Sequence, residues 1–355
     1  MSDELKTVYA TLQKSCLVND KPLEYETVES PWFVKVLLAF SAWLAAAFLL
    51  GFVGTLFEHI LDNRLTAIVI GLVMIGGAYS ILRIPKNEFV KHLALALSFA
   101  GQTLVVWSIF KFHNLDDTLA WGIVMLLQAS LAFYMPDFIH RVVSSYFAAI
   151  ALALLLENSG ALHLYFGLIM FSAAYLWLNE FKYPTHMRAL RAIGYGQVLA
   201  LIQIKGSVLF QSALGWRWSY NNTEIWVQPW VGEIISSIVM MYVVWQLLQR
   251  YASNASQQFV VITLISVLIF CAVSMEANGI SVGMVILLVG FAGSNRVLMG
   301  LGIASLLFYI SSYYYLLDAT LLAKAQTLFV VGLVLLSGRW LMLRVLPKTK
   351  EAQNV

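Results

Sequence analysis

Charged residues are scarce in this sequence, and their scarcity indicates the class of protein. Asp, Glu, Lys and Arg make up 12% of the 355 residues, whereas 60% are hydrophobic, and the mean hydropathy is +0.79. Soluble domains carry about 25% charged residues. We therefore expect a membrane protein. The net charge of +3 is small and does not indicate a nucleic-acid-binding surface.

Cysteines and catalytic motifs are also few. Cys16 and Cys271 are too few for a disulfide framework. The sequence has no phosphate-binding glycine loop, no H-E-x-x-H and no cysteine pair with metal-ligand spacing. It therefore predicts no metal site, no cofactor and no catalytic residue. No two of the six histidines are three or four residues apart, so we interpret them as residues of the membrane interface. They are His59, His92, His113, His140, His163 and His186.

The two ends of the chain are polar, and long apolar runs lie between them. Residues 1–31 lack the basic-then-apolar pattern of a cleaved signal, and we expect a cytoplasmic tail there, either half-ordered or with a short amphipathic helix. Residues 32–345 are expected to form one transmembrane domain, and residues 346–355 a cytoplasmic C-terminal tail. The apolar runs lie near 33–57, 65–82, 91–110, 118–136, 141–156, 160–179, 188–206, 229–249, 257–274, 277–294, 297–317 and 320–343.

Each run is about the length that crosses a bilayer as a helix, roughly 20 residues. Because the hydrocarbon core offers no water, each run must satisfy its own backbone hydrogen bonds and is therefore helical. The predicted fold is an all-α bundle of about twelve transmembrane helices. The run at 188–206 fits least well, because Lys205 interrupts it and apolar residues resume at Val208.

The lysines and arginines predict the orientation. With twelve helices and the N-terminus inside, 17 of the 22 fall on the inner side. The other five are Arg64, Lys111, Lys205, Arg217 and Lys324. Positive residues are retained in the cytoplasm, so we expect both termini to be cytoplasmic. The same topology separates the two cysteines across the membrane.

Five charged residues fall near the outer ends of the runs. They are Lys205, Glu233, Glu276, Asp318 and Lys324. Charges within a bilayer are costly and often functional, so these residues form a candidate polar cluster that lines an outward-open cavity, with the lysines paired to the carboxylates. In the alternative interpretation each is only a helix end: Lys324 reaches the surface, and Asp318 or Thr320 caps the last helix.

Aromatic residues gather on the same predicted side. The long outer loop near 207–228 and the turn after residue 312 provide a candidate contact surface. Its members are Trp216, Trp218, Tyr220, Trp226, Tyr313, Tyr314 and Tyr315. The alternative is an aromatic belt at the level of the lipid headgroups.

Four amides are the main polar residues in the middle of the runs. They are Gln102, Gln128, Gln197 and Gln203. We expect them to form hydrogen bonds between helices.

The last two runs resemble a known family. The stretch GLGIASLLFYISSYYYLLDATLLAKAQTLFVVGLVLLSGRWL is similar to the C-terminal signature of a domain-of-unknown-function family, number 4401 in its series. PWFVKVLLAFSAWLAAAFLLGFVG resembles the family's first membrane segment. The resemblance implies a multi-pass protein of the bacterial inner membrane. It also suggests as partner a neighbouring membrane-anchored protein with a GDYxxLxY motif. The resemblance implies no reaction and no catalytic residues. It marks as candidates the positions that match the signature, which are Tyr313, Tyr314, Tyr315, Asp318, Thr320, Lys324 and Arg339.

Three functions fit the sequence. The first is a non-enzymatic membrane component that works with a membrane or periplasmic-facing partner, through the outer aromatic residues. The second is a transporter of a small molecule or lipid that uses the outer charged cluster. The third is a membrane enzyme that acts on a lipid-linked substrate, for which we see no acid–base constellation.

Overall fold

The computed structural model describes most of the apolar region. The described residues are 63–84, 88–111, 115–214, 226–252, 256–275, 279–316 and 320–345, together with single helical positions between 34 and 51. The predicted tails, 1–31 and 346–355, lie outside the described residues, so these two boundaries remain predictions.

Within these ranges the regular structure is entirely helical. The α-helices are α4 (Arg64–Arg83), α5 (Glu88–Phe110), α6 (Asp117–Tyr134), α7 (Phe138–Asn158), α8 (Leu162–Leu178), α9 (Met187–Leu214), α10 (Pro229–Tyr251), α11 (Gln257–Ser274), α12 (Ile280–Ala292), α13 (Arg296–Leu316) and α14 (Leu321–Val345). Two short 3₁₀ turns, η1 (Glu180–Lys182) and η2 (Pro184–His186), connect α8 to α9.

Short polar residues begin several of these helices. The Asn63 side chain accepts from the backbone N–H groups of Leu65 and Thr66 and so caps α4. Asp137 caps α7 by accepting from the N–H of His140 at 3.1 Å. These carboxylate and amide oxygens satisfy N–H groups that have no partner inside their helix. The predicted runs therefore become discrete helices with defined starts.

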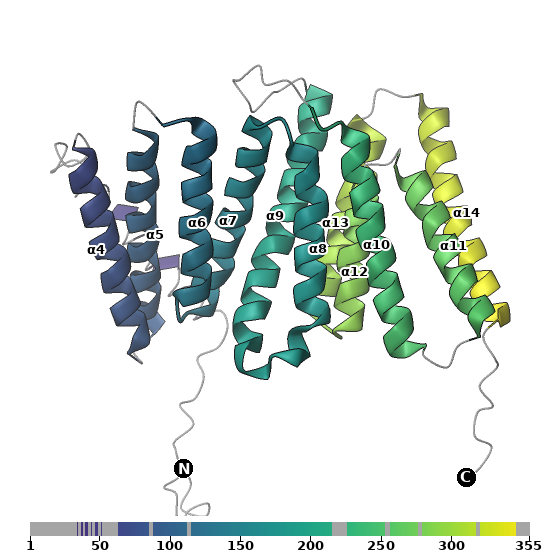
Figure 1. The fold of residues 1–355 in the computed structure, drawn as a ribbon, viewed down its shortest axis with the longest axis horizontal. Coiled ribbons are helices and arrows are strands. Elements are labelled where there is room, and N and C mark those ends of the chain that lie inside the picture. The colour runs from purple at the N-terminus through teal and green to yellow at the C-terminus, as the bar shows by residue number, and fades with distance from the viewer. Residues whose placement is uncertain are drawn as a thin grey trace, which may run out of the picture.

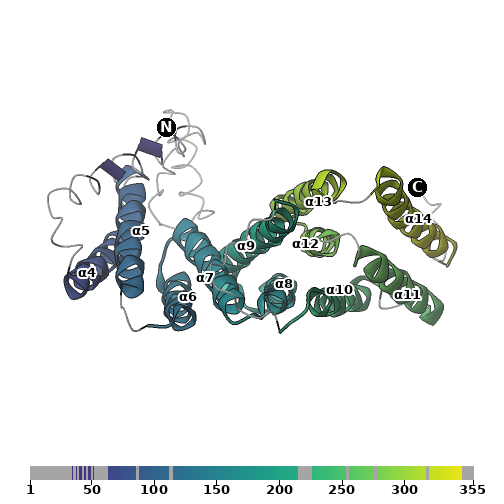
Figure 2. The same ribbon diagram turned by 90° about the horizontal axis from the view of Figure 1, so that it is seen from above.

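The helices stand side by side in one long layer, and consecutive helices run in opposite directions (Figure 1). From above, the layer is elongated, with α7, α9 and α13 along one side and α6, α8 and α10 along the other (Figure 2). The pair α4–α5 lies at one end of the layer and the pair α11–α14 at the other. Helix α9 is the centre of the layer, in contact with α7, α8, α12 and α13.

The main apolar core lies where α7, α8, α9, α10, α12 and α13 meet. Tyr165, Phe166, Leu201, Val243 and Leu298 are among its most buried side chains. A smaller cluster joins α4, α5, α6 and α7. Many large apolar side chains outside these clusters remain exposed on the helix faces. That distribution suits a protein whose surroundings are lipid rather than water.

Six of the described helices are long and apolar enough to cross a membrane: α4, α5, α6, α7, α9 and α10. Four more, α8, α11, α12 and α13, have shorter apolar stretches of 10–17 residues within the described ranges. A helical membrane protein is therefore the fold class that the structure supports, and the count of twelve spans remains a prediction.

One predicted boundary was wrong. The run expected near 141–156 corresponds to α7, which extends from Phe138 to Asn158 and begins after the Asp137 cap. We expected another run to end near residue 206, but α9 continues through Lys205 to Leu214. Lys205 does not end the helix, since a residue from the next helix neutralises its charge, as described below.

The alternation of the helices gathers basic residues at one end of the layer. Arg83 ends α4, Arg141 lies in the first turn of α7, Arg188 begins α9, Arg250 ends α10 and Arg296 begins α13. Because successive helices reverse direction (Figure 1), these positions share one end, which we call the basic end. The opposite end is where the helices of the pairs α5–α6, α7–α8, α9–α10, α11–α12 and α13–α14 are connected.

Candidate functional site

A buried ion pair joins α9 and α10 near the opposite end. The Lys205 ammonium donates to Glu233 Oε1, and the two residues are 5% and 7% exposed. The ammonium also lies 4.4 Å from the centre of the Phe166 ring on α8, a cation–π contact. Three helices therefore neutralise a charge that would be costly on any one of them in a bilayer.

Two glycines bring α8 and α10 close enough to bury this pair. A Cβ atom at Gly232 would lie 2.6 Å from the carbonyl oxygen of His163, and one at Gly167 would overlap the side chain of Ile235. Neither position has room for a larger residue, so the glycines set the spacing of the helices. Glu233 follows Gly232 directly and is thereby held at this tight crossing.

A third polar side chain lies one turn along α10. The Ser236 hydroxyl is buried and has no hydrogen-bond partner among the described residues. A buried hydroxyl without a partner costs about 1–3 kcal/mol. Lys205, Glu233 and Ser236 thus form a polar site inside an apolar layer. In the described ranges, no group of three His, Cys, Asp or Glu residues has the arrangement of a metal site.

A second polar network lies nearer the basic end, around His140 of α7. Its ring is fully buried and stacks on Phe99 at 5.0 Å. Nε2 lies 2.8 Å from Ser98 Oγ and 3.1 Å from Gln102 Nε2, both on α5. Nδ1 lies 3.1 Å from Ser144 Oγ on its own helix. Every polar atom of the imidazole therefore has a partner.

The network continues in two directions. Gln128 of α6 donates to Gln102 Oε1 at 3.0 Å. Toward the basic end, Asp137 accepts from the His140 backbone and forms an ion pair with Lys91 at 3.0 Å. The result is a line of hydrogen-bonding groups from Lys91 into the interior, which joins α5, α6 and α7.

The interpretation of His140 as an interfacial residue was wrong. It lies close to the start of α7, but its neighbours on α5 bury it completely. The spacing of the histidines relative to one another does not indicate these partners, which lie about forty residues away in sequence. The spacing Asp137-x-x-His140-x-x-x-Ser144 was the local signal, because it places a cap, an imidazole and a hydroxyl on neighbouring turns.

The prediction for the four central amides is confirmed. Besides the Gln102–Gln128 bond, Gln197 of α9 donates to Ser172 of α8 at 3.0 Å, and Gln203 of α9 accepts from Tyr146 of α7. Each amide thus links two helices.

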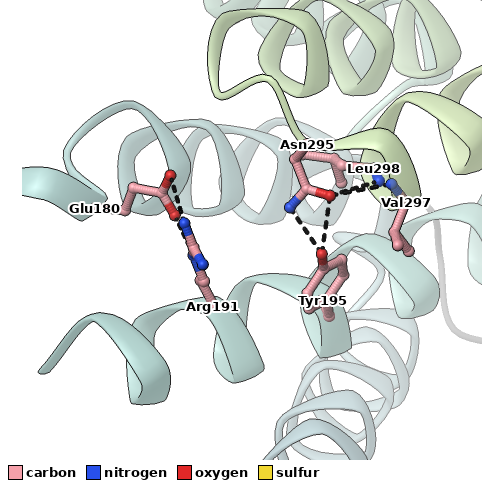
Figure 3. A network of polar contacts seen from close by, with 6 residues as sticks. All are labelled: Glu180, Arg191, Tyr195, Asn295, Val297 and Leu298. Carbon is pink, nitrogen blue, oxygen red and sulfur yellow. Dashed lines mark hydrogen bonds and ion pairs between the residues drawn. The ribbon is translucent and has the colours of Figure 1, made fainter. Parts of the chain in front are cut away.

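Polar contacts also lock the connections at the basic end (Figure 3). Arg191 Nε donates to Glu180 Oε2 at 2.8 Å, which ties η1 to α9. The Asn295 amide donates to Tyr195 Oη at 2.7 Å, and Asn295 Oδ1 accepts from the N–H groups of Val297 and Leu298. Asn295 therefore caps α13 and holds it against α9 at the same time.

A family model decides the relationship of the chain to known proteins. The model described as "Domain of unknown function (DUF4401)" matches residues 31–345. The chain belongs to the DUF4401 family. The resemblance predicted from the last two runs is thereby confirmed. No curated protein and no solved structure matches the chain.

The DUF4401 match includes the ion pair, the His140 network and the α13–α14 hairpin. In that hairpin Thr320 Oγ1 accepts from the N–H of Ala323 at 3.3 Å and so caps α14, as one of the two interpretations predicted. Tyr315 is 80% exposed. Asp318 lies outside the described residues, as do the side chains of Tyr313, Tyr314 and Lys324.

Of the candidate outer polar cluster, the structure brings Lys205 and Glu233 together. Glu276 lies outside the described residues, so the remainder of the cluster remains a prediction. Of the candidate aromatic surface, Trp226 is described and 67% exposed. Its indole N–H donates to the Ser159 carbonyl at 2.5 Å. Trp216, Trp218 and Tyr220 lie outside the described residues.

Proposed function

We propose that this DUF4401 protein is a non-enzymatic, multi-pass component of the bacterial inner membrane that works with a partner protein at its outer face. In this proposal twelve helices cross the membrane and both termini are cytoplasmic. The gathering of Arg83, Arg141 and Arg250 at one end supports the orientation, because positive residues are retained on the cytoplasmic side. The opposite end of the layer is then the outer face.

One observation carries the proposal: exposed aromatic side chains lie at the end of the layer opposite the basic end, where hydrogen bonds and an ion pair hold the helices together. The Trp226 indole is tied to the α7–α8 connection, and the neighbouring Val227 N–H donates to the Gly160 carbonyl at 3.3 Å. Below them the Lys205–Glu233 pair fixes α9 to α10. Rigid, exposed aromatic residues are typical of interface hot spots, since little side-chain entropy is lost when a partner covers them.

The partner that we propose is the membrane-anchored protein with a GDYxxLxY motif that the family resemblance suggests. Membrane lipid surrounds the remaining helix faces. We propose no nucleic-acid partner, and no cofactor or catalytic residue enters the proposal.

Co-purification tests this function. An affinity-tagged chain is expressed with the GDYxxLxY protein, and the double variant Trp226→Ala/Tyr315→Ala is compared with wild type. The matched control is Phe181→Ala/Tyr183→Ala, which removes two aromatic residues that are similarly exposed but lie at the basic end. We expect the first variant to lose the partner and the control to retain it. Equal recovery by all three proteins would contradict the proposal.

The second candidate is a transporter, which the buried site at Lys205, Glu233 and Ser236 favours. Ion pairs inside a membrane commonly mark a transport pathway, and an unpartnered hydroxyl beside one suits a substrate or water. In a Cys16→Ser/Cys271→Ala background, Ser236→Cys reports whether the outer side reaches this site. Rapid reaction of the introduced thiol with a membrane-impermeant reagent supports the transporter, whereas complete protection of that thiol favours the partner-binding component.

A further inference from the structure

An apolar groove separates the α11–α14 pair from α10 and α12. Its volume is about 600 Å³, within the range of roughly 300–1,000 Å³ typical of ligand pockets. Figure 2 shows α11 and α14 together at the end of the layer, beside α10 and α12. Met240, Phe270, Met284 and Val334 line the groove, one from each helix.

The hydroxyl groups on its wall do not make the groove polar. Thr263 donates to the Phe259 carbonyl and Ser266 to the Ile262 carbonyl, both at 2.8 Å. Tyr251, at the mouth, donates to the Ala292 carbonyl at 2.7 Å. Since each hydroxyl hydrogen is already used, the wall presents almost only carbon to an occupant.

The groove carries a cation at its basic end. Arg339 of α14 is exposed and lines the groove. In the part of the chain that the structure describes, no carboxylate or carbonyl pairs with its guanidinium. Arg250, at the same end, instead donates to the Leu178 carbonyl. Trp340 follows Arg339, and tryptophan favours the headgroup level of a membrane. Next to the Arg339 guanidinium in sequence is therefore a residue type that favours the level of the lipid phosphates.

The length of the groove matches one leaflet. Along α10 it extends from Ala252 to Met240, which is about 18 Å of helix. Half of a hydrocarbon core is roughly 15 Å. An apolar channel of one-leaflet depth with a guanidinium at its mouth is complementary to an acyl chain that ends in an anionic headgroup.

We propose that this groove is a binding site for an anionic phospholipid of the leaflet at the basic end. One acyl chain lies between α10, α11, α12 and α14, and the phosphate accepts hydrogen bonds from Arg339. Basic positions between transmembrane helices are known to bind anionic headgroups. The lipid would also fill the space that separates the α11–α14 pair from its neighbours, and so attach that pair to the rest of the layer.

The test measures lipid binding to the purified full-length protein in detergent. Phosphatidylglycerol, phosphatidylcholine with the same acyl chains, and inorganic phosphate are titrated separately, with the thermal midpoint and native mass spectrometry as readouts. The variants are Arg339→Gln, the conservative Arg339→Lys and the control Arg296→Gln. Arg296 is exposed and lies at the basic end, at the start of α13 rather than in the groove.

We expect phosphatidylglycerol to bind wild type and Arg296→Gln more tightly than phosphatidylcholine does. Arg339→Gln is expected to reduce that preference roughly fivefold, the contribution of one basic residue near an anionic lipid, and Arg339→Lys is expected to restore most of it. Equal binding of the two lipids, or an unchanged preference in Arg339→Gln, would overturn the proposal. Stabilisation by inorganic phosphate alone would indicate a soluble-anion site and would overturn it as well.

A second variant tests the acyl chain separately from the charge. Val334→Phe fills part of the groove without any change at Arg339. We expect it to weaken phosphatidylglycerol binding while the protein stays folded by circular dichroism. Undiminished binding in folded Val334→Phe would show that the chain does not occupy the groove. None of these readouts depends on the partner protein, so failure here is distinguishable from failure of the proposed function.

Discussion

Replacing Lys205 by methionine would leave the Glu233 carboxylate buried without its cation. Glu233 is 7% exposed, and it follows Gly232, where α10 packs closely against the His163 backbone. The reverse change, Glu233→Leu, would leave the ammonium with only the Phe166 ring, 4.4 Å away. The double variant Lys205→Met/Glu233→Leu removes both charges and keeps similar side-chain volumes.

The magnitudes of these effects differ sharply. Removing one partner of a buried pair costs about 3–5 kcal/mol, whereas replacing both with apolar residues is often neutral or stabilising. The cation–π contact offsets part of the cost in Glu233→Leu, by roughly 1–2 kcal/mol. We therefore expect Lys205→Met to be the more destabilising single change. The double variant should have a free energy of unfolding close to that of wild type, and the coupling energy between the two residues is then about 3 kcal/mol or more.

Reversible unfolding of the detergent-solubilised protein by SDS, followed by tryptophan fluorescence, measures these free energies. Arg296→Met is the control, since it removes an exposed cation at the basic end, away from the pair, and should leave the unfolding midpoint unchanged. If both single variants unfold at the wild-type midpoint, or if the double variant is as unstable as the sum of the singles, the pair is not a coupled, buried unit and the reasoning fails.

Three further changes test the other contacts. His140→Phe keeps the stacking on Phe99 but leaves Gln102 without its imidazole partner. We expect the free energy of unfolding to fall by at least about 2 kcal/mol in the same assay. A stability equal to that of wild type would refute the network. Asn295→Ala removes the cap of α13 and its contact with Tyr195; a loss of about 1–2 kcal/mol is expected, and it should exceed that of Tyr195→Phe, which leaves the cap intact. Gly279→Ala places a Cβ atom at a φ of +97°, 2.7 Å from the Tyr309 ring, so we expect a lower thermal midpoint. The control Gly300→Ala, whose Cβ atom meets nothing within 4 Å, should not lower it. Equal midpoints for the two variants would contradict the strain at Gly279.

The number and order of the described helices could be predicted from hydropathy, because each apolar run is a continuous local pattern. Every run from the second to the last contains one helix. The ends were less predictable. The start of α7 depends on the Asp137 cap, a local signal that precedes the apolar residues, while the extension of α9 to Leu214 depends on a carboxylate in another helix.

The site was predictable only in its residue types. Lys205 and Glu233 stood out as charges within apolar runs, but 28 residues separate them, and their meeting depends on which helices are neighbours. Likewise, the sequence predicts that the amides form hydrogen bonds between helices, but it does not predict which residues pair. His140 was misread because its partners lie on α5, some forty positions earlier. Each of these contacts depends on which helices are neighbours in the layer, and hydropathy does not specify that.

The Lys205–Glu233 pair also has a consequence for how the protein enters the membrane. A nascent chain presents Lys205 before Glu233 has been synthesised. A lone lysine within a transmembrane helix is costly during insertion, by about 2.5–3.5 kcal/mol when it lies at the helix centre and less toward an end. Helix α9 is among the less apolar of the described spans. We expect α9 to remain at the bilayer interface until α10 follows, and the two helices to enter together as a hairpin with the charges already paired.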